Sequence, residues 1–324
     1  MNKVVAITIG DINGIGIKIL FKSWQKKHVR NFILFTDHKI LKKNFRDNII
    51  KKNFNIINKK KQKLVYDKKR INIFSYNSSS SEDNTYKSLK YAYKFCKKKI
   101  CIGILTLPLR KDLIIQKVDK NFIGHTEFFQ KIEKKNNANM ILFHNRIIIS
   151  PLTTHRKLKD VSKLIANKEF LYNQIFNLNN SLKIDFNINK PKLIISGFNP
   201  HAGENGKLGS EEKNYIIPVV KKLKINKIDI EGPFSADSIL INKNLKKYDC
   251  FIFIYHDQAL IPFKFISQFS GVNFTGNLDI IRTSPDHGTA YNLKNTKDIS
   301  SKSFLNFYKL INKIYKNRII NETG

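Results

Sequence analysis

The feature that most constrains this fold is a pattern that occurs three times: an apolar run followed by a polar turn that contains histidine. The runs and their histidines are Ile147–Ile149 before His155, Leu193–Ile195 before His201, and Phe251–Tyr255 before His256. Short apolar runs bounded by turn residues are typical of buried strands. In open α/β sheets, ligands bind beyond the carboxyl ends of the strands. The pattern therefore predicts an α/β fold with three histidines near a ligand-binding edge.

Three such histidines suggest a metal site. Imidazole is a common ligand of zinc and similar ions, and three protein ligands with one open position are the usual catalytic arrangement. Two acids, Asp237 and Asp257, lie near these turns in the sequence. The spacings are too long for a zinc finger, so a metal here would be catalytic. The alternative is a set of incidental histidines in surface loops.

Length and charge restrict the function classes. The 324 residues, 41% of them hydrophobic, can fill two domains or one large α/β unit. The net charge of +34 would ordinarily suggest nucleic-acid binding. Here the lysine excess is spread along the chain, together with many asparagines and isoleucines, and no nucleic-acid motif accompanies it. We expect no nucleic-acid partner, although a basic field favours an anionic small substrate.

Cysteine usage and hydropathy bear on the compartment. The three cysteines, Cys96, Cys101 and Cys250, are odd in number and lack metal-type spacing, which suits a reducing cytoplasm. No apolar run approaches membrane-spanning length, and the first residues enter a strand-like run without a signal-peptide core. We therefore expect a cytoplasmic protein without a membrane partner.

The amino-terminal part reads as strand, glycine-rich turn and helix: Val4–Ile9, Gly10–Gly16 and Ile17–Gln25. The glycine spacing matches neither the dinucleotide fingerprint nor a P-loop, so we expect a structural or substrate-facing turn. The segment Leu41–Arg70 is rich in Lys and Asn and is predicted to be a poorly specified surface region. Apolar residues at helical spacing predict an amphipathic helix over Thr85–Lys99.

His125 and Thr126 precede a predicted helix and allow two interpretations. Thr126 could cap the helix. Alternatively, both side chains could face an anion at the helix amino terminus, where free N–H groups favour negative charge.

Six motifs in this order resemble the 4-hydroxythreonine-4-phosphate dehydrogenase family of vitamin B6 biosynthesis. They are Gly124–Phe129, Thr153–His155, Gly197–Glu204, Gly232–Asp237, Tyr255–Gln258 and Ile281–Ala290. The resemblance implies two α/β/α domains of the isocitrate and isopropylmalate dehydrogenase-like type, with the active site in the interdomain cleft. The first domain would comprise 1–120 plus 285–324. The second, 121–284, would carry the metal ligands and the interface of a homodimer with shared active sites.

The reaction implied by the resemblance is the NAD-dependent oxidation and decarboxylation of 4-phosphooxy-L-threonine to 3-amino-2-oxopropyl phosphate, in pyridoxal 5'-phosphate biosynthesis. NADP is the other possible cofactor, and zinc, magnesium or cobalt would assist. The nearest alternative is a dehydrogenase of a phosphorylated four-carbon sugar acid, threonate or erythronate phosphate. A metallohydrolase that activates water at the three histidines is an alternative from another class.

The resemblance also implies residue roles. The metal ligands would be His155, His201 and His256, the last contributed across the dimer interface, and the candidates for proton transfer are Asp237, Asp257 and Lys264. The substrate would contact His125, Thr126, Lys264, Asn273 and Arg282, and the cofactor His287, Gly288 and Thr289.

Three segments depart from the family pattern. The turn Gly10–Gly14 lacks the usual proline, and Leu107 stands where glycine is common. Tyr291–Lys297 replaces a glycine-bearing cofactor loop. The departures therefore affect the implied cofactor site more than the implied metal site.

Overall fold

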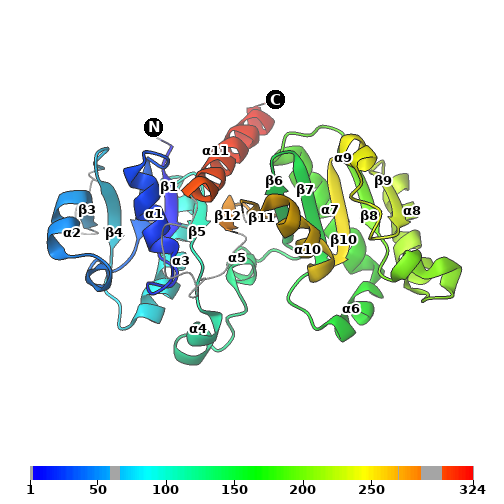
Figure 1. Cartoon of the computed structure of the whole chain (residues 1–324), viewed down its shortest axis with the longest axis horizontal. Helices are drawn as coiled ribbons and strands as arrows, with labels where there is room; N and C mark the ends of the chain where they lie inside the picture. The colour runs from blue at the N-terminus through cyan, green and yellow to red at the C-terminus, as the bar shows by residue number, and fades with distance from the viewer. Residues whose placement is uncertain (1–2, 59–65, 269, 286–300, 324) are drawn as a thin grey trace. The chain divides into compact units, whose positions relative to one another are not determined.

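The computed structural model describes residues 3–58, 66–268, 270–285 and 301–323. The chain forms two compact units, Met1–Phe129 with Asp279–Tyr315 (unit 1) and Gln130–Leu278 with Lys316–Gly324 (unit 2). Figure 1 shows strands flanked by helices in both units. The predicted α/β class is confirmed.

Unit 1 contains a parallel array of strands in the order β3-β4-β2-β1-β5-β12. The strands are β1 (Val5–Thr8), β2 (Phe32–Phe35), β3 (Phe54–Asn58), β4 (Ile71–Ser75), β5 (Ile104–Thr106) and β12 (Arg282–Pro285). All residues of β1 and β2 are buried, as expected for parallel strands covered on both faces.

The helices of unit 1 connect these strands. They are α1 (Gly16–Gln25), the short 3-10 turn η1 (Ile40–Lys43), α2 (Asp47–Asn53), α3 (Ser81–Lys97), α4 (Lys111–Lys117), the first part of α5 (His125–Ile132) and α11 (Ser301–Thr323) through Tyr315. The helix predicted over Thr85–Lys99 corresponds to α3. It begins earlier because the Ser80 hydroxyl accepts a hydrogen bond from the Asp83 N–H and caps the first turn.

The prediction of a poorly specified surface region over Leu41–Arg70 is wrong for residues 41–58. This segment contains η1, α2 and β3, and Phe45 and Phe54 are buried. The Phe21 ring of α1 lies 5.0 Å from the Phe45 ring and 6.0 Å from the Phe54 ring, centroid to centroid. The aromatic residues of this Lys- and Asn-rich segment are thus anchored by a helix distant in the sequence.

Unit 2 contains a mixed array of strands in the order β11-β6-β7-β10-β8-β9. The strands are β6 (Asn139–His144), β7 (Ile147–Thr153), β8 (Lys192–Ser196), β9 (Asp229–Phe234), β10 (Cys250–Tyr255) and β11 (Val272–Gly276). β6 pairs antiparallel with β11 and β7, whereas β7, β10, β8 and β9 are parallel. The three strands that precede the candidate histidines are therefore adjacent and point the same way.

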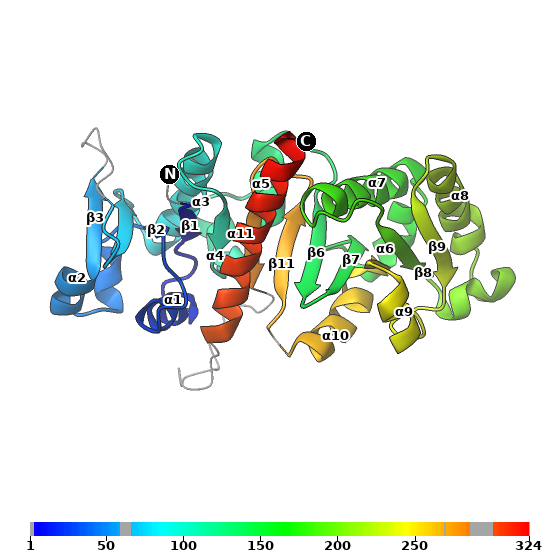
Figure 2. The same cartoon turned by 90° about the horizontal axis from the view of Figure 1, so that it is seen from above.

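Helices lie on both sides of these strands, with α7 and α8 on one side and α9 and α10 on the other (Figure 2). The elements are α6 (Leu158–Ile165), α7 (Lys168–Ile184), η2 (Pro200–Gly206), the π-helical turn η3 (Glu212–Ile216), α8 (Ile217–Ile225), α9 (Asn242–Lys247), α10 (His256–Ser267) and the end of α11. Alternate residues of β10, Phe251 and Phe253, pack with Ala259 and Phe263 of α10.

Two predictions from the sequence concern the domain boundaries and membrane-spanning helices. The predicted first domain, 1–120 plus 285–324, and unit 1 of the structure are both discontinuous. His125, Thr126 and Arg282, which the prediction gave to the second domain, 121–284, belong to unit 1. Among the helices of the described residues, none has the length and apolar character required to cross a membrane.

Candidate functional site

The candidate metal ligands occupy the turns at the carboxyl ends of adjacent parallel strands in unit 2. Tyr255 at the end of β10 is in register with Thr153 at the end of β7, and β10 also pairs with β8. His155 follows β7, His256 begins α10 directly after β10, and His201 lies in η2 after β8. The fold thus places all three histidine-bearing turns at one edge of the strand array.

His155 and His256 are neighbours, with ring centroids 5.8 Å apart. Two imidazoles that bind one tetrahedral zinc through nitrogens about 2.0–2.1 Å away have ring centres roughly 5 Å apart. The pair therefore fits a shared divalent metal in donor chemistry and approximately in spacing. Within the described part of the chain, no three His, Cys, Asp or Glu side chains group so as to hold a metal ion. Binding of a metal by all three histidines therefore stays a prediction. Two of them, His155 and His256, are neighbours in the structure.

The candidate acids and Lys264 differ in surroundings. Asp257 is exposed and accepts a hydrogen bond from His256 Nδ1 over 2.9 Å, which leaves His256 Nε2 available for another partner. Asp237 is exposed in the turn after β9. Lys264 is half-buried on α10, the helix that begins at His256. Asp257 is therefore hydrogen-bonded to His256, one of the candidate metal ligands.

The His201 turn has an unusual backbone. Five successive residues from His201 to Asn205 adopt positive φ angles between 42° and 79°. His155 also has a positive φ of 51°. Such conformations are unfavourable for residues other than glycine and concentrate at functional sites.

The carboxylate of Glu212 fixes the start of this turn through hydrogen bonds. It is 3% exposed and accepts hydrogen bonds from the Phe198 N–H and the Asn199 N–H, each over 2.8 Å. A Cβ atom on Gly203 would lie 2.6 Å from Glu212 Oε2, so only glycine allows this approach. Glu212 was not among the predicted site residues.

Unit 1 contains a buried, positively charged side chain, that of Arg282. Arg282 begins β12, is 2% exposed, and donates from Nε and Nη2 to the hydroxyl of Thr106 over 3.1 and 2.8 Å. Its Nη1 donates to Thr126 Oγ1 over 3.4 Å. Burial lowers the pKa of Arg282 to about 10, so the guanidinium remains charged at neutral pH. Thr106, at the end of β5, was not among the predicted site residues.

Thr126 and His125 begin α5. The two interpretations of Thr126 were a cap and an anion contact; in the structure its hydroxyl accepts from Arg282 and lies inside the helix rather than before it. His125 is half-buried, but its Nε2 atom is enclosed and has no hydrogen-bond partner. Burial, Arg282 and Lys111 hold the pKa of His125 well below its usual value. A neutral imidazole beside a buried guanidinium is suited to an anionic ligand.

We expect His125 to make the protein sensitive to acid. Because the folded state keeps His125 neutral while the unfolded chain takes up a proton near pH 6.5, stability should fall as pH drops below that value. His125→Gln should remove about 1–2 kcal/mol of the loss between pH 7.5 and 5. Urea unfolding of both proteins at the two pH values tests this, since other histidines cancel in the comparison. Equal pH dependence would contradict the enclosed neutral imidazole.

Asn273, the remaining predicted substrate contact, lies on β11 in unit 2. It is half-buried, and its Oδ1 atom is enclosed without a hydrogen-bond partner. Because buried polar groups are nearly always paired, such an atom calls for a missing partner. A ligand donor would supply one.

The first glycine turn is packed rather than open. A Cβ atom on Gly16 would lie 3.3 Å from the Leu107 Cβ, and Leu107 is 1% exposed. The contact between Gly16 and Leu107 supports the structural interpretation of the turn.

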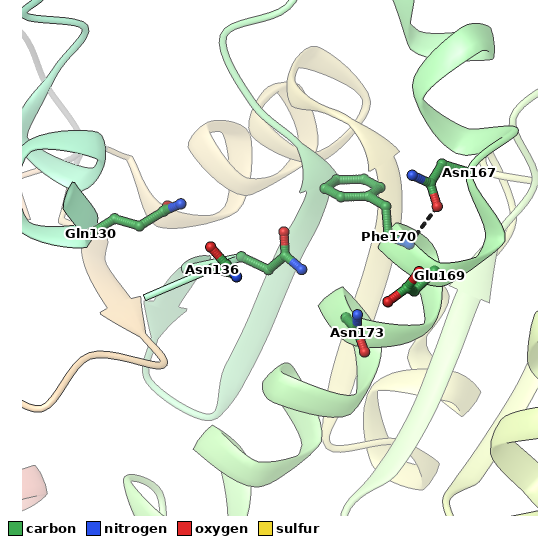
Figure 3. Close-up of a pocket in the computed structure, with 7 residues that line it drawn as sticks. Gln130, Asn136, Asn167, Glu169, Phe170 and Asn173 are labelled. Atoms are coloured by element: carbon green, nitrogen blue, oxygen red, sulfur yellow. Dashed lines mark hydrogen bonds between the residues drawn. The ribbon is translucent and has the colours of Figure 1, made fainter. Parts of the chain in front are cut away.

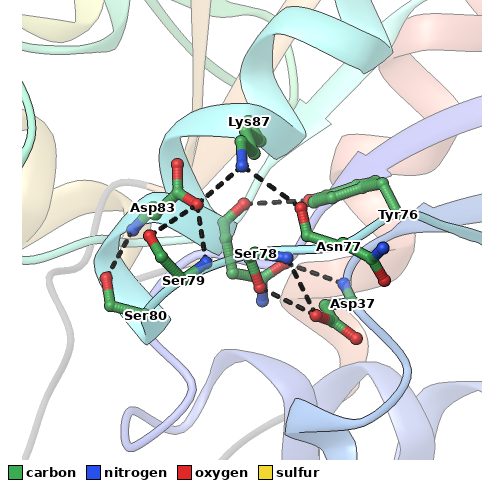
Figure 4. Close-up of polar contacts among 9 residues, drawn as sticks. Asp37, Tyr76, Asn77, Ser78, Ser79, Ser80, Asp83 and Lys87 are labelled. Carbon is green, nitrogen blue, oxygen red and sulfur yellow. Dashed lines mark hydrogen bonds and ion pairs between the residues drawn. The ribbon is translucent and has the colours of Figure 1, made fainter.

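Asp37 follows β2, and its carboxylate has partners of its own. Its Oδ2 accepts from the backbone N–H and the hydroxyl of Ser78, as Figure 4 shows.

The predicted cofactor contacts His287, Gly288 and Thr289 lie outside the described residues. A separate hollow of about 300 Å³ in unit 2 contains none of the predicted site residues (Figure 3). Its walls carry amide side chains, one carboxylate and one phenyl ring, from Gln130, Asn136, Asn137, Asn167, Asn173, Glu169 and Phe170.

Comparison with known sequences gives a consistent result. A family model described as pyridoxal phosphate biosynthetic protein PdxA matches residues 28–311. The chain is 38% identical to a 4-hydroxythreonine-4-phosphate dehydrogenase of Wigglesworthia glossinidia brevipalpis, over 94% of each chain. It is 35% identical to one from a Sulfurihydrogenibium species, over 92% of this chain and 94% of that protein.

Solved structures agree. A 4-hydroxythreonine-4-phosphate dehydrogenase from Klebsiella pneumoniae superposes with a TM-score of 0.80 at 25% identity, over 97% of this chain and 100% of that one. One from Burkholderia phymatum gives a TM-score of 0.74 at 27% identity, over 96% and 98% of the two chains.

Proposed function

Because this chain belongs to the pyridoxal phosphate biosynthetic protein PdxA family, we propose that it is a 4-hydroxythreonine-4-phosphate dehydrogenase. The substrate is 4-phosphooxy-L-threonine. Its hydroxyl-bearing carbon gives a hydride to NAD or NADP and its hydroxyl gives a proton. The resulting β-keto acid then loses carbon dioxide, and the carbon that carried the carboxylate takes up a proton, which gives 3-amino-2-oxopropyl phosphate. Family membership over residues 28–311 is the observation that carries the proposal.

His155, His201 and His256 are the proposed ligands of a divalent metal, which is zinc, magnesium or cobalt. His256 would be contributed by the second copy of a homodimer, and the 5.8 Å separation of the His155 and His256 rings within one chain supports the position of both turns at the same edge of unit 2. When bound, such an ion polarises the substrate hydroxyl and the later carbonyl as a Lewis acid. Asp257 orients the His256 ring by accepting from its Nδ1, which leaves Nε2 for the metal.

The substrate is held by fixed charge and by enclosed polar atoms. Arg282, positioned by Thr106, supplies a buried guanidinium for phosphate or carboxylate, and Thr126 and His125 lie beside it. Asn273 offers an enclosed carbonyl oxygen as an acceptor, and Lys264 a second cation. Asp237, Asp257 and Lys264 are the proposed proton-transfer groups, and His287, Gly288 and Thr289 the proposed cofactor contacts.

The test is NADH formation by metal-stripped protein. With NAD and 4-phosphooxy-L-threonine, absorbance at the NADH band should rise only after zinc, magnesium or cobalt is added. Substrate preference is measured in parallel with threonate and erythronate phosphates, which lack the amino group; a site that pairs an ammonium rejects them. Faster turnover of the sugar acids would contradict the assigned substrate, and metal-dependent hydrolysis without NAD would replace the oxidoreductase with a hydrolase.

The functional assembly is proposed to be a homodimer with shared active sites. One face of α10, the helix that starts at His256, leaves Ile261 and Phe265 71% and 79% exposed. These residues lie one helical turn apart and form an apolar strip that a second copy would cover. Light scattering of the purified protein should give twice the mass of the chain, and a monomer mass at micromolar concentration would exclude the shared site.

The three cysteines fit a cytoplasmic enzyme. Cys96, Cys101 and Cys250 take part in no disulfide bond among the described residues. Burial raises the pKa of Cys101 to about 12 and that of Cys250 further, so neither is a reactive thiolate.

A further inference from the structure

A lysine of unit 1 lies close to the start of α5. Lys111 is the first residue of α4, and its side chain extends to Gly124, the residue before His125. A Cβ atom on Gly124 would lie 3.3 Å from both Cε and Nζ of Lys111, which is a tight contact. The glycine therefore leaves room for the ammonium group next to the segment that carries His125.

Lys111 and Arg282 act on the same imidazole. After burial, the positive charges of Arg282 and then of Lys111 are the causes that hold the pKa of His125 low. Arg282 also donates to the hydroxyl of Thr126, the residue that follows His125. Two cations of unit 1 thus lie near one imidazole and one hydroxyl, although they belong to different elements, α4 and β12.

An acid, Glu127, lies beside the two cations. A Cβ atom on Gly124 would lie 2.8 Å from Glu127 Oε2, so the carboxylate approaches the same glycine as Lys111. Its negative charge raises the pKa of Arg282 against the effect of burial. Two cations against this one carboxylate leave a net positive charge, which attracts an anion.

We propose that Lys111 is a further substrate-binding residue, which holds the phosphate of the substrate together with Arg282. This inference rests on the proposed function. A phosphate monoester carries about two negative charges and has three acceptor oxygens, so it can bind two cations at once. The guanidinium of Arg282 is planar and fixed, whereas the lysine ammonium is a point charge on a flexible stem that can follow the phosphate. A neutral His125 can donate from Nε2, an enclosed atom without a hydrogen-bond partner.

The alternative is an ion pair between Lys111 and Glu127 that only fastens α4 to α5. In that case both charges would stabilise the same structure, and loss of either would change phosphate binding in the same direction. A phosphate site predicts opposite directions, because Lys111 attracts the phosphate and Glu127 repels it.

The test measures binding of inorganic phosphate to the full chain by isothermal titration calorimetry at constant ionic strength. The variants are Lys111→Met and Glu127→Gln, and the control is Lys117→Met. Lys117 lies on the same helix as Lys111 and pairs with Glu82 over 2.9 Å, so its loss changes the net charge equally but removes a different contact. The KM for 4-phosphooxy-L-threonine is measured in parallel, and urea midpoints report stability.

We expect Lys111→Met to raise the dissociation constant of phosphate about tenfold, as loss of a charge-assisted contact does. Glu127→Gln should lower that constant about threefold. Lys117→Met should bind phosphate as the wild-type protein does, and the KM should rise in Lys111→Met alone.

Three results would overturn the proposal: phosphate affinity in Lys111→Met equal to that of Lys117→Met, weaker binding in both Lys111→Met and Glu127→Gln, or no phosphate binding by the wild-type protein. The expected pattern of phosphate binding without NADH formation from 4-phosphooxy-L-threonine would overturn the dehydrogenase assignment and leave Lys111 as a phosphate-binding residue.

Discussion

Replacing Arg282 with methionine should lower kcat/KM for the phosphorylated substrate by about 100- to 1,000-fold, since loss of a buried charged partner costs roughly 2–5 kcal/mol. The guanidinium is 2% exposed and is fixed in place by two hydrogen bonds to Thr106. The guanidinium is therefore already fixed in position before the substrate binds. Initial rates of NADH formation over a range of substrate concentrations measure the effect.

Two further variants sharpen this test. Arg282→Lys should recover little activity, because an ammonium cannot bond Thr106 twice and reach Thr126 as well. Arg70→Met is the control: Arg70 is an exposed arginine paired with Asp67, and its loss should leave kcat/KM unchanged. A decrease of less than threefold in a folded Arg282→Met protein would contradict the assigned role.

The largest effect on stability is expected at Arg318. Its Nε donates to the buried Asp185 carboxylate over 2.6 Å, and its Nη2 donates to the Leu278 carbonyl over 3.0 Å. Removing one partner of a buried ion pair leaves a charge without compensation, so Arg318→Met should lower the free energy of unfolding by about 3–5 kcal/mol. Urea unfolding at pH 7.5 measures this change.

The pH dependence of the Arg318 variant provides an independent check. Burial already raises the pKa of Asp185, although Arg318 opposes it. Without Arg318 the folded protein would favour a protonated carboxyl, whose contribution to stability is present at low pH and is lost as pH rises. The destabilisation should therefore be greater at pH 8 than at pH 5. Adding Asp185→Asn should restore much of the stability, and a double variant as unstable as the single one would contradict the ion-pair explanation.

Part of the site could be predicted because residues close together in the sequence form its pattern. Each candidate metal ligand follows an apolar run, and parallel strands bring such positions to one edge, where His155 and His256 are indeed neighbours. The helix α3 was likewise predictable from the spacing of Leu89 and Ala92. Periodicity and strand ends can be recognised in one sequence without knowledge of distant contacts.

Other parts could not be predicted because they depend on partners far apart in the chain. Phe45 and Phe54 lie in a segment whose lysines and asparagines hide its apolar pattern, and their partner Phe21 belongs to another helix. Thr106 and Glu212 act through the hydrogen bonds of one side chain each. A single threonine or glutamate carries no periodic signal, so only the folded structure reveals which groups it binds.

The contact between Gly16 and Leu107 limits the order in which this chain can change. Alanine at position 16 would press its methyl group against the Leu107 side chain, whose atoms lie 3.3–3.5 Å from that Cβ position. Shortening Leu107 first would open a void in a buried place and lower stability, typically by about 2–5 kcal/mol for a leucine reduced to alanine. A larger side chain at position 16 therefore requires the Leu107 side chain to move or to become smaller. The two positions share one volume, so we expect their side-chain sizes to change in opposite directions among descendants of this sequence.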